Sequence, residues 1–261
     1  MTNLRKLLED GAISEAIGLV SRDEDLLEDL IGLLEDTDED IQRSAFEVVS
    51  QTSSIQNVLE AIPTLIGGLE SDEDEICRFA AEALYFFGPD AADATESLAN
   101  LLDHDDDDIR RAAARTLRAI GAGAVEALQR LIEALQDSDE TVRGEAALSI
   151  GNIGSDDPEP IPSLVKALAD EEEFEVDGKP LEVRHAAQQA LKQLGNTAVP
   201  GLLEALRDDR AELRLMAVET LASIPTLSDV AIELLEATVN DPDSTVSSAA
   251  QKAIKQINAT K

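Results

Sequence analysis

A short pattern in the middle of the chain constrains the fold more than any other feature. Residues 142–154 read Val-Arg-Gly-Glu-Ala-Ala-Leu-Ser-Ile-Gly-Asn-Ile-Gly. Its apolar residues at helical spacing are Val142, Ala146, Ile150 and Ile153. Residues spaced in this way form one stripe along an α-helix. The acidic turn 137–140 offers side-chain oxygens to the helix N-terminus, and Gly154 suits its C-terminal cap. The pattern therefore predicts a helix that buries one face.

The same pattern recurs along the chain at nearly regular intervals. Its first residue, here named the anchor, is followed by alanine at position +4 and by an aliphatic residue at +8. The anchors are Ile41, Ile76, Ile109, Val142, Val183, Leu213 and Val246, spaced by 35, 33, 33, 41, 30 and 33 residues. A leucine or valine at position −7 closes a preceding helix at Leu34, Leu69, Leu102, Leu135, Leu206 and Val239. Each repeat is therefore expected to contain helix A, an acidic turn and helix B.

The period of about 33 residues is shared by several helical repeat arrays. The T-P-L-H turn of ankyrin repeats is absent, and so is the Trp, Gly-Tyr and Pro pattern of tetratricopeptide repeats. The pattern instead resembles the short HEAT-like repeats of the phycobilisome-lyase type, A-x-P-x-L-x-x-A-L-x-D-x-x-x-x-V-R-x-x-A-A-x-A-L-G-x-I-G. The match is good over residues 109–121, 142–154 and 183–195. The resemblance implies an all-α fold, an α-solenoid (superhelix) of about seven HEAT-like helix-pair repeats.

The expected organisation is a single α-solenoid domain over residues 1–261. Residues 1–22 are predicted to form an N-terminal capping helical pair, and residues 23–258 the repeats. The long repeat carries an inserted acidic loop at residues 171–182, between its helices A and B. Such loops often contact partners, although an insertion is also tolerated at little cost. Phe174 and Val176 favour the first interpretation.

The family resemblance also implies a role for the arginine that follows the anchor. In repeats of this type that arginine pairs with an acid of a neighbouring repeat. The arginine is kept at Arg110, Arg143, Arg184 and Arg214, and it is replaced by Gln42, Cys77 and Ser247. We therefore expect the ladder of ion pairs to weaken toward both ends of the array.

The composition is strongly acidic but still that of a folded chain. Of the 261 residues, 55 are acidic and 21 are Lys or Arg, so the net charge is −34. An apolar content of 43% excludes a disordered acidic chain. The excess of Arg over Lys and the charge density resemble proteins of extreme halophiles, in which carboxylates maintain hydration at high salt. The alternative is an acidic adaptor from a mesophile.

Cysteine content and hydropathy indicate a soluble cytoplasmic protein. Cys77 is the only cysteine, so neither an internal disulfide nor a cysteine-based metal site is expected. The first ten residues have no long apolar segment typical of a signal peptide, and no apolar run approaches the length of a membrane span.

Residues suited to catalysis are sparse. The two histidines, His104 and His185, stand at non-equivalent positions of different repeats. Neither forms the His-Glu pair with which HEAT-like deoxyhypusine hydroxylases bind iron. The acidic clusters lack the register of a calcium-binding loop and suit helix N-caps. We therefore expect no catalytic residue, no metal site and no cofactor.

The side of helix B opposite its buried stripe carries a different charge from the rest of the chain. These positions, +2, +6 and +9 from each anchor, define the B-helix face. Its 21 residues include 8 Lys or Arg and only 3 Glu. In HEAT-type solenoids the B helices usually line the concave surface. The resemblance thus implies a neutral-to-basic groove inside an acidic shell.

One part of the B-helix face combines an aromatic residue with several arginines. Tyr85 is expected beside the arginines of the next repeat, and such combinations are common in binding hot spots. The predicted partner-binding residues are Arg78, Tyr85, Arg111, Arg115, Arg118, Leu148, His185 and Lys192. The alternative is that these arginines only relieve repulsion within an acidic protein. Phe79, Phe86 and Phe87 are expected in the core.

Three functions fit the sequence. The first is a non-enzymatic protein–protein interaction scaffold that binds an acidic or amphipathic segment on the concave B-helix face. The second, implied by the resemblance, is a bilin-lyase-like enzyme or lyase subunit, although no residue is assigned to that chemistry. The third is a nucleic-acid-binding HEAT-like protein, which the net charge of −34 opposes. A protein partner without membrane association is expected, and the oligomeric state is left open.

Overall fold

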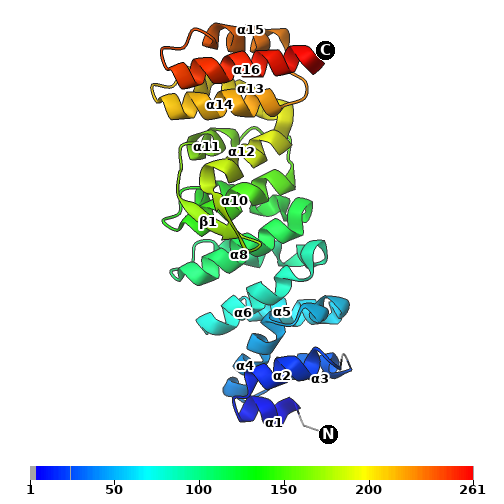
Figure 1. Cartoon of the computed structure of the whole chain (residues 1–261). Coiled ribbons are helices and arrows are strands. Elements are labelled where there is room, and N and C mark those ends of the chain that lie inside the picture. The colour runs from blue at the N-terminus through cyan, green and yellow to red at the C-terminus, as the bar shows by residue number, and fades with distance from the viewer. Residues whose placement is uncertain (1–3, 24, 261) are drawn as a thin grey trace. The chain divides into compact units, whose positions relative to one another are not determined.

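Pairs of α-helices account for most of the structure. The computed structural model describes residues 4–23 and 25–260. The predicted fold class, an all-α solenoid, is confirmed. By its internal contacts the chain divides into two compact units, Met1–Arg130 (unit 1) and Leu131–Lys261 (unit 2), and each is described by itself (Figure 1).

Unit 1 begins with two short helices and continues with helix pairs. The helices α1 and α2 coincide with the segment predicted as a cap, of which residues 1–3 lie outside the described residues. The α-helices are α1 (Leu4–Glu9), α2 (Ile13–Val20), α3 (Leu26–Leu33), α4 (Glu39–Ser50), α5 (Ile62–Gly68), α6 (Asp74–Tyr85), α7 (Thr95–Leu101) and α8 (Asp107–Ile120). Short 3₁₀ segments are η1 (Ser53–Asn57), η2 (Leu59–Ala61), η3 (Gly88–Ala94) and η4 (Gly121–Ala127). Helix α9 (Leu128–Ala134) lies across the unit boundary.

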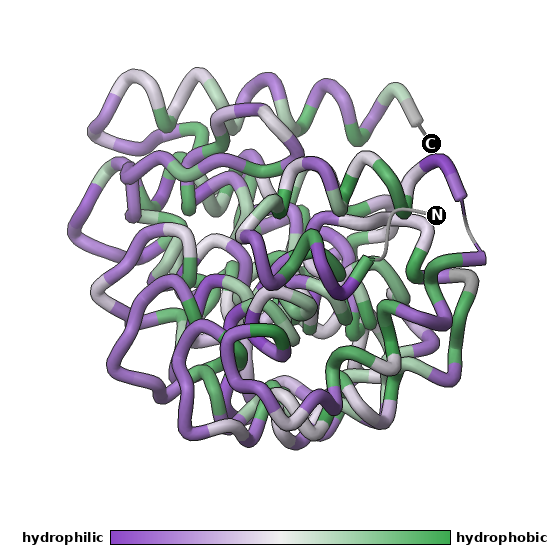
Figure 2. The backbone as a smooth tube through the Cα atoms, turned by 90° about the horizontal axis from the view of Figure 1, so that it is seen from below, coloured by the Kyte–Doolittle hydropathy of each residue, from purple (hydrophilic) through white to green (hydrophobic). Residues whose placement is uncertain are grey.

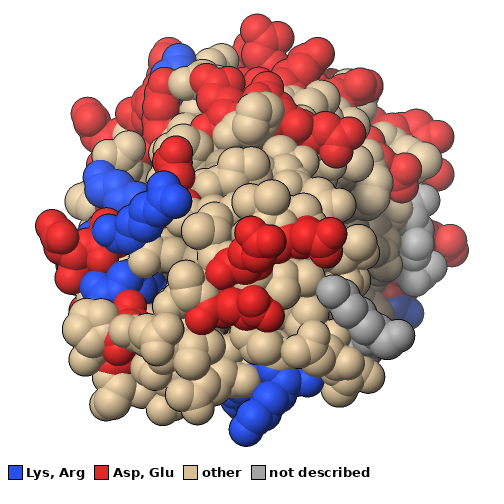
Figure 3. All heavy atoms as spheres, turned by 90° about the horizontal axis from the view of Figure 1, so that it is seen from above, with Lys and Arg blue, Asp and Glu red and all other residues tan. Residues whose placement is uncertain are grey.

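Unit 2 has the same alternation of short and long helices. Its helices are α10 (Glu140–Ile153), α11 (Ile161–Ala167), α12 (Val183–Leu194), α13 (Val199–Ala205), α14 (Ala211–Ser223), α15 (Asp229–Thr238) and α16 (Ser244–Thr260), with the 3₁₀ segment η5 (Gly195–Ala198). Two antiparallel strands, β1 (Glu173–Val176) and β2 (Lys179–Glu182), stand between α11 and α12. In Figure 3 acidic side chains crowd one margin of the end that carries α15 and α16.

The long B helices stack on one another within each unit. In unit 1, α4 packs on α6 and α6 packs on α8; in unit 2, α10, α12, α14 and α16 follow in the same way. The alanines at +4 explain how the helices approach so closely. All seven have 0% exposed surface: Ala45, Ala80, Ala113, Ala146, Ala187, Ala217 and Ala250. A methyl side chain allows close contact of two helices, and any larger group would have to displace its neighbours.

Sequence periodicity also placed the remaining core residues correctly. Every anchor is buried, from Val142 at 0% exposure to Ile76 and Leu213 at 3%. The aliphatic residues at +8 are buried as well, except Ile254 of the last repeat, which is half-buried. Figure 2 shows the resulting alternation of hydrophobic positions within helices and hydrophilic turns between them.

The insertion at residues 171–182 is not the loop that was expected from the sequence. It forms a β-hairpin in which Phe174 pairs with Leu181 and Val176 with Lys179. Both turn residues, Asp177 and Gly178, have positive φ, at 50° and 75°. An Asp-Gly pair favours this two-residue type I′ turn, whose twist matches that of the strands. The insertion is therefore an ordered structural element.

Candidate partner-binding surface

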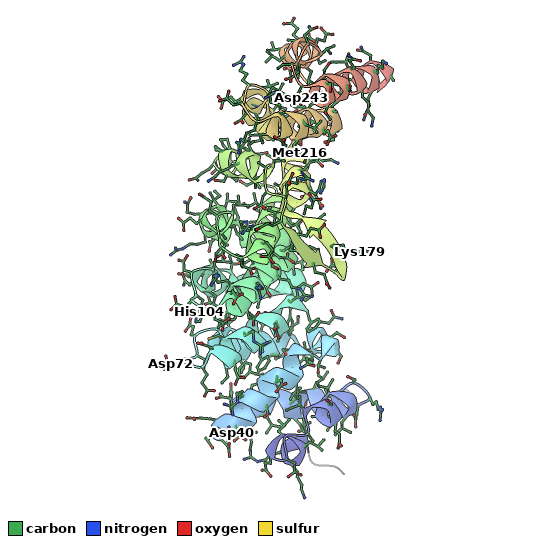
Figure 4. The ribbon with its side chains drawn as sticks, turned by 60° about the vertical axis from the view of Figure 1, so that its left-hand side comes forward. Asp40, Asp72, His104, Lys179, Met216 and Asp243 are labelled. Carbon is green, nitrogen blue, oxygen red and sulfur yellow. The ribbon has the colours of Figure 1, made fainter. Side chains whose placement is uncertain are left out.

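The acidic turns before the B helices are mainly capping structures. The N-cap residue at −3 accepts hydrogen bonds from the first helical N–H groups in α4, α8, α10 and α16, through Asp38, Asp106, Asp139 and Asp243. The residue at −5 accepts from the N–H two residues later, as Asp137 does from Asp139 at 2.8 Å. Asp40, Asp72 and His104 in Figure 4 mark these turn regions in unit 1. Many of the carboxylates thus stabilise helix N-termini.

The arginine after the anchor holds neighbouring turns together, as the family resemblance implied. Arg143 Nε donates to Asp170 at 2.7 Å, and its Nη1 donates to the carbonyls of Asp137 (2.9 Å) and Ser138 (3.0 Å). Another ion pair joins Arg143 to Glu172. These bonds connect α10 with the end of the next helix A. The arginine is therefore part of the framework and is not available to a partner.

A second member of this arginine set forms a two-pronged ion pair. Arg214 Nε and Nη2 each donate to Asp241 at 2.8 Å. This pairing lowers the pKa of Asp241 and raises that of Arg214. In the adjacent turn, hydrogen bonds from Arg210 lower the pKa of Asp208 to about 2. The carboxylates around α14 thus stay ionised well below neutral pH.

Where the arginine is replaced, a shorter polar group performs a local version of its role. The side chains of Gln42, Cys77 and Ser247 each donate to the carbonyl eight residues earlier, at 2.8, 3.5 and 2.6 Å. That carbonyl belongs to the residue at −7 that closes helix A. Burial raises the pKa of the Cys77 thiol, which also donates to the Ser71 carbonyl at 3.0 Å. These residues tie helix B to its own helix A, without an ion pair to the next repeat.

Most arginines on the B-helix face of unit 1 are neutralised by acids of their own helix. Arg78 Nη1 lies 2.9 Å from Glu82 Oε1, and its guanidinium carbon lies 4.3 Å from the Phe79 ring centroid. Arg111 contacts Asp107 at 2.5 Å and Asp108 at 2.7 Å. Salt bridges across one turn of helix reduce the positive potential that an arginine presents to solution. The face is therefore less basic than its composition suggests.

Arg115 differs from these neighbours. Its side chain is exposed, and its guanidinium carbon lies 4.3 Å from the centroid of the Tyr85 ring on α6. Within residues 4–23 and 25–260, Arg115 makes no ion pair with an acid. The Tyr85 ring meets that of half-buried Phe86 edge to face, with centroids 5.8 Å apart. Arg118 is half-buried and engaged within the protein. The structure thus brings together Tyr85 and Arg115 from successive B helices.

The prediction that Leu148 contributes to an open face is wrong. Leu148 is only 5% exposed, and Gly144 and Gly151 on the same side of α10 are also buried. The Phe174 ring of β1 occupies the space where a Cβ of Gly144 would lie. A Cβ at Gly151 would come within 2.9 Å of the Ala190 Cα on α12. Because glycine has no side chain, neighbouring segments close over this part of α10.

Burial also changes the interpretation of Phe174 as a partner contact. Its side chain is 5% exposed and fixes the hairpin to α10. By contrast, His185 and Lys192 on α12 are exposed, with His185 Nδ1 4.0 Å from Glu182 Oε2. A partner-binding role for these two residues stays a prediction.

Each unit has a surface groove, and none of the predicted partner-binding residues lines either of these two grooves. A groove of about 490 Å³ in unit 1 lies between α4 and α5 and is lined by Leu34, Phe46 and Pro63 among others. One of about 530 Å³ in unit 2 contains Arg143, Lys166 and Asp170. Arg143 is already bonded to Asp170, and Lys166 donates to Gln136 at 3.1 Å. Arg143, Asp170 and Lys166 of the unit 2 groove are thus bonded within the protein.

Two features are absent from residues 4–23 and 25–260. No group of three or more His, Cys, Asp or Glu side chains there is arranged to hold a metal ion. No helix there is long and apolar enough to cross a membrane.

Comparison with known proteins agrees with this architecture. The stacked helix pairs define the chain as a repeat protein of the α-solenoid class. The sequence profile of the HEAT repeats matches residues 9–85, 95–179 and 176–255. The chain belongs to the HEAT repeat family. No curated protein matches it.

Solved structures share the fold at low sequence identity. The crystal structure of an engineered protein has 26% identity and a TM-score of 0.65, covering 94% of this chain and 71% of the engineered one. A designed armadillo repeat protein in complex with the peptide (KR)4 has 20% identity and a TM-score of 0.51, covering 89% and 99%. Importin beta has 16% identity and a TM-score of 0.64, covering 91% of this chain and 36% of importin beta. The last two similarities concern the fold alone.

Proposed function

We propose that this protein is a non-enzymatic interaction scaffold that binds an acidic or amphipathic segment of a partner protein. The proposed contact surface is the B-helix face of unit 1, with Arg115 and Tyr85 at its centre. The proposed surface also includes Arg78, Arg111 and Arg118 at its periphery. The observation that carries the proposal is the exposed Arg115 guanidinium, which is stacked on Tyr85 and makes no ion pair within the described residues.

The chemistry of this pair suits a carboxylate ligand. In a protein of net charge −34, acids are available to neutralise arginines, and most arginines of this face are paired with them. The Tyr85 ring holds the Arg115 guanidinium in place by a cation–π contact. A planar guanidinium offers two parallel N–H donors to a carboxylate, and an ordered side chain loses less entropy on binding.

The structural neighbours support a role in protein binding. One of them is a designed armadillo repeat protein in complex with a peptide. Stacked helix pairs offer extended surfaces for such ligands. We do not propose a bilin-lyase activity, because no residue of this chain is assigned to that chemistry. Nucleic-acid binding is opposed by the net charge of −34.

Affinity purification from a native extract at native salt, followed by mass spectrometry, tests the proposal. Co-purifying proteins should be lost with Arg115→Glu and reduced with Tyr85→Ala. Arg130→Glu is the matched control, because Arg130 is an exposed arginine of unit 1 that pairs with Asp103 away from the B-helix face. Partners that bind the wild type and Arg115→Glu equally would refute the proposal. A parallel Lys192→Glu variant tests the predicted role of α12.

We also propose that the acidic composition is an adaptation to high salt. A separate proposal is that the HEAT repeats are of the phycobilisome-lyase type. Repulsion within a protein of net charge −34 weakens when salt screens it. Thermal unfolding should therefore shift to higher temperature as potassium chloride rises from millimolar to molar concentration. A melting temperature independent of salt would contradict this part of the proposal.

A further inference from the structure

The hairpin between α11 and α12 has a hydrogen-bonding pattern that can be assigned residue by residue. A two-residue turn of its type makes the flanking residues, Val176 and Lys179, a hydrogen-bonded pair. Hydrogen-bonded and non-hydrogen-bonded pairs then alternate along the strands. The Val183 N–H donates to the Glu172 carbonyl at 2.9 Å, which agrees with this alternation. Phe174–Leu181 is consequently a hydrogen-bonded pair, whereas Glu175–Pro180 and Glu173–Glu182 are of the non-hydrogen-bonded kind.

The two outer edges of the hairpin differ. The backbone groups of the non-hydrogen-bonded pairs point away from the partner strand. On β2 one of these residues is Pro180, which has no N–H, and proline blunts an edge. On β1 both residues, Glu173 and Glu175, keep their N–H and carbonyl groups, and both are exposed. The edge of β2 is thus blocked by proline, whereas that of β1 can accept another strand.

The open edge also carries unbalanced negative charge. Glu173 stands directly opposite Glu182, and like charges in such a pair are unfavourable. Arg184 is engaged by Glu182 at 2.5 Å and by Glu171 at 2.8 Å. Among the described residues, Glu173 and Glu175 make no ion pair. A cationic strand laid along β1 would meet both carboxylates.

The other face of the hairpin is held by the helices. Phe174 is 5% exposed and packs on Gly144 of α10, which orders β1 before any partner arrives. Figure 4 shows Lys179 at the free end of the hairpin, which stands out from the helices of unit 2. An ordered and accessible edge lowers the entropic cost of adding a strand.

We propose that the β1 edge binds an extended basic segment of a partner protein, which adds to the hairpin as a third strand. The N–H and carbonyl groups of Glu173 and Glu175 supply the backbone hydrogen bonds. Lysine or arginine at alternate positions of the ligand pairs with the two glutamates, and the residues between them face the helices. This site is separate from the surface around Arg115, and its test does not depend on that proposal.

A short synthetic peptide of alternating lysine and valine is the probe. Added to the ¹⁵N-labelled full chain at low ionic strength, it should shift the amide signals of Glu173 and Glu175 and slow their exchange with solvent. A peptide of the same composition with its lysines and valines in two blocks should bind more weakly. Equal binding of both peptides, or shifts spread evenly over the acidic turns, would show non-specific attraction and overturn the proposal.

Two variants at one position separate backbone pairing from charge. Glu175→Pro removes an outward N–H while leaving the hydrogen-bonded pairs of the hairpin intact, and it should weaken binding about three- to tenfold. Glu175→Gln keeps that N–H and should weaken binding less, by an amount that shrinks as salt is added. Slow solvent exchange of the Phe174 and Leu181 amides, which are hydrogen-bonded to each other's residue across the strands, shows that the hairpin persists in Glu175→Pro. Wild-type affinity in that variant with the hairpin intact would overturn the proposal.

Discussion

Helices α8 and α10 follow the same repeat rule and have the same length of 14 residues, yet they use their outer positions differently. On α8 the B-helix face carries arginines, and exposed Arg115 stacks on Tyr85 of the neighbouring α6. On α10 the equivalent positions are covered, and Phe174 lies against Gly144. A helix that follows the repeat rule, such as α10, can thus have its outer side covered by another element, here the β-hairpin. Large effects on stability are therefore expected on α10 and effects on binding on α8.

The largest effect on stability is expected from removing the aromatic ring of Phe174, which fixes the hairpin to α10. Phe174→Ala should lower the free energy of unfolding by about 3 kcal/mol, because a buried ring is lost over Gly144 and a cavity remains. Urea unfolding followed by circular dichroism measures the loss. A change below about 0.5 kcal/mol would mean that α10 does not rely on the hairpin.

The framework arginine of α10 ranks next. Arg143→Met retains much of the apolar stem but leaves Asp170 and two turn carbonyls without their donor. A loss of about 2 kcal/mol is expected, less than for a fully buried pair because Glu172 is largely exposed. The same unfolding measurement applies. Stability equal to that of the wild type would remove the distinction between framework and surface arginines.

A single added methyl group tests the close approach on α10. Gly144→Ala should destabilise the protein by about 1 kcal/mol, because overlap with the Phe174 ring outweighs the better helix propensity of alanine. The double variant with Phe174→Ala should lose this penalty, which a double-mutant cycle reveals. Gly18→Ala is the control, since a Cβ at Gly18 meets nothing within 4 Å and should stabilise α2.

Acid should weaken the turns around α14 selectively. Arg214 lowers the pKa of Asp241, and Arg210 lowers that of Asp208 to about 2, relative to an unfolded value of about 3.9. Because the folded pKa values are the lower ones, both contributions are present above about pH 4 and are lost as the pH falls through the folded pKa values, of which that of Asp208 is about 2. The free energies of unfolding of the wild type and Asp241→Asn, measured as a function of pH, should converge as the pH falls. A difference between the two free energies that does not change with pH would contradict the lowered pKa of Asp241.

The smallest change in stability is expected on α8. Arg115→Met should alter the free energy of unfolding by less than about 0.5 kcal/mol, because the side chain is exposed and makes no ion pair within the described residues. The same variant should lose the partner in affinity purification. A loss of stability as large as that of Arg143→Met would place Arg115 in the framework instead.

The repeat core could be predicted from sequence because it depends on local spacing. Alanine at +4 and an aliphatic residue at +8 define one side of a helix whatever it packs against. The arginine after the anchor was assigned correctly by resemblance at Arg143 and Arg214, whose bonds reach the next repeat. Arg184 departs from this pattern, because it pairs with two glutamates of the insertion in its own repeat. The hairpin was missed although Asp177-Gly178 between apolar residues is a recognisable turn signal.

The candidate surface could be predicted only in part. The sequence places Tyr85 and Arg115 on the outer sides of successive helices, and their contact follows from stacking. It does not show that Arg78 and Arg111 are paired with acids of their own helices, because ion pairing depends on side-chain distances. Nor does it show that Leu148 is buried.

Sequence alone therefore determined the helix pairs, their buried stripes and the repeat family, since these follow from periodic spacing along a single helix. Tertiary structure alone decided which outer positions stay open, because that depends on what packs over each helix. A glycine such as Gly144 looks like free surface in the sequence. In the folded protein its missing side chain is the reason that Phe174 can cover it.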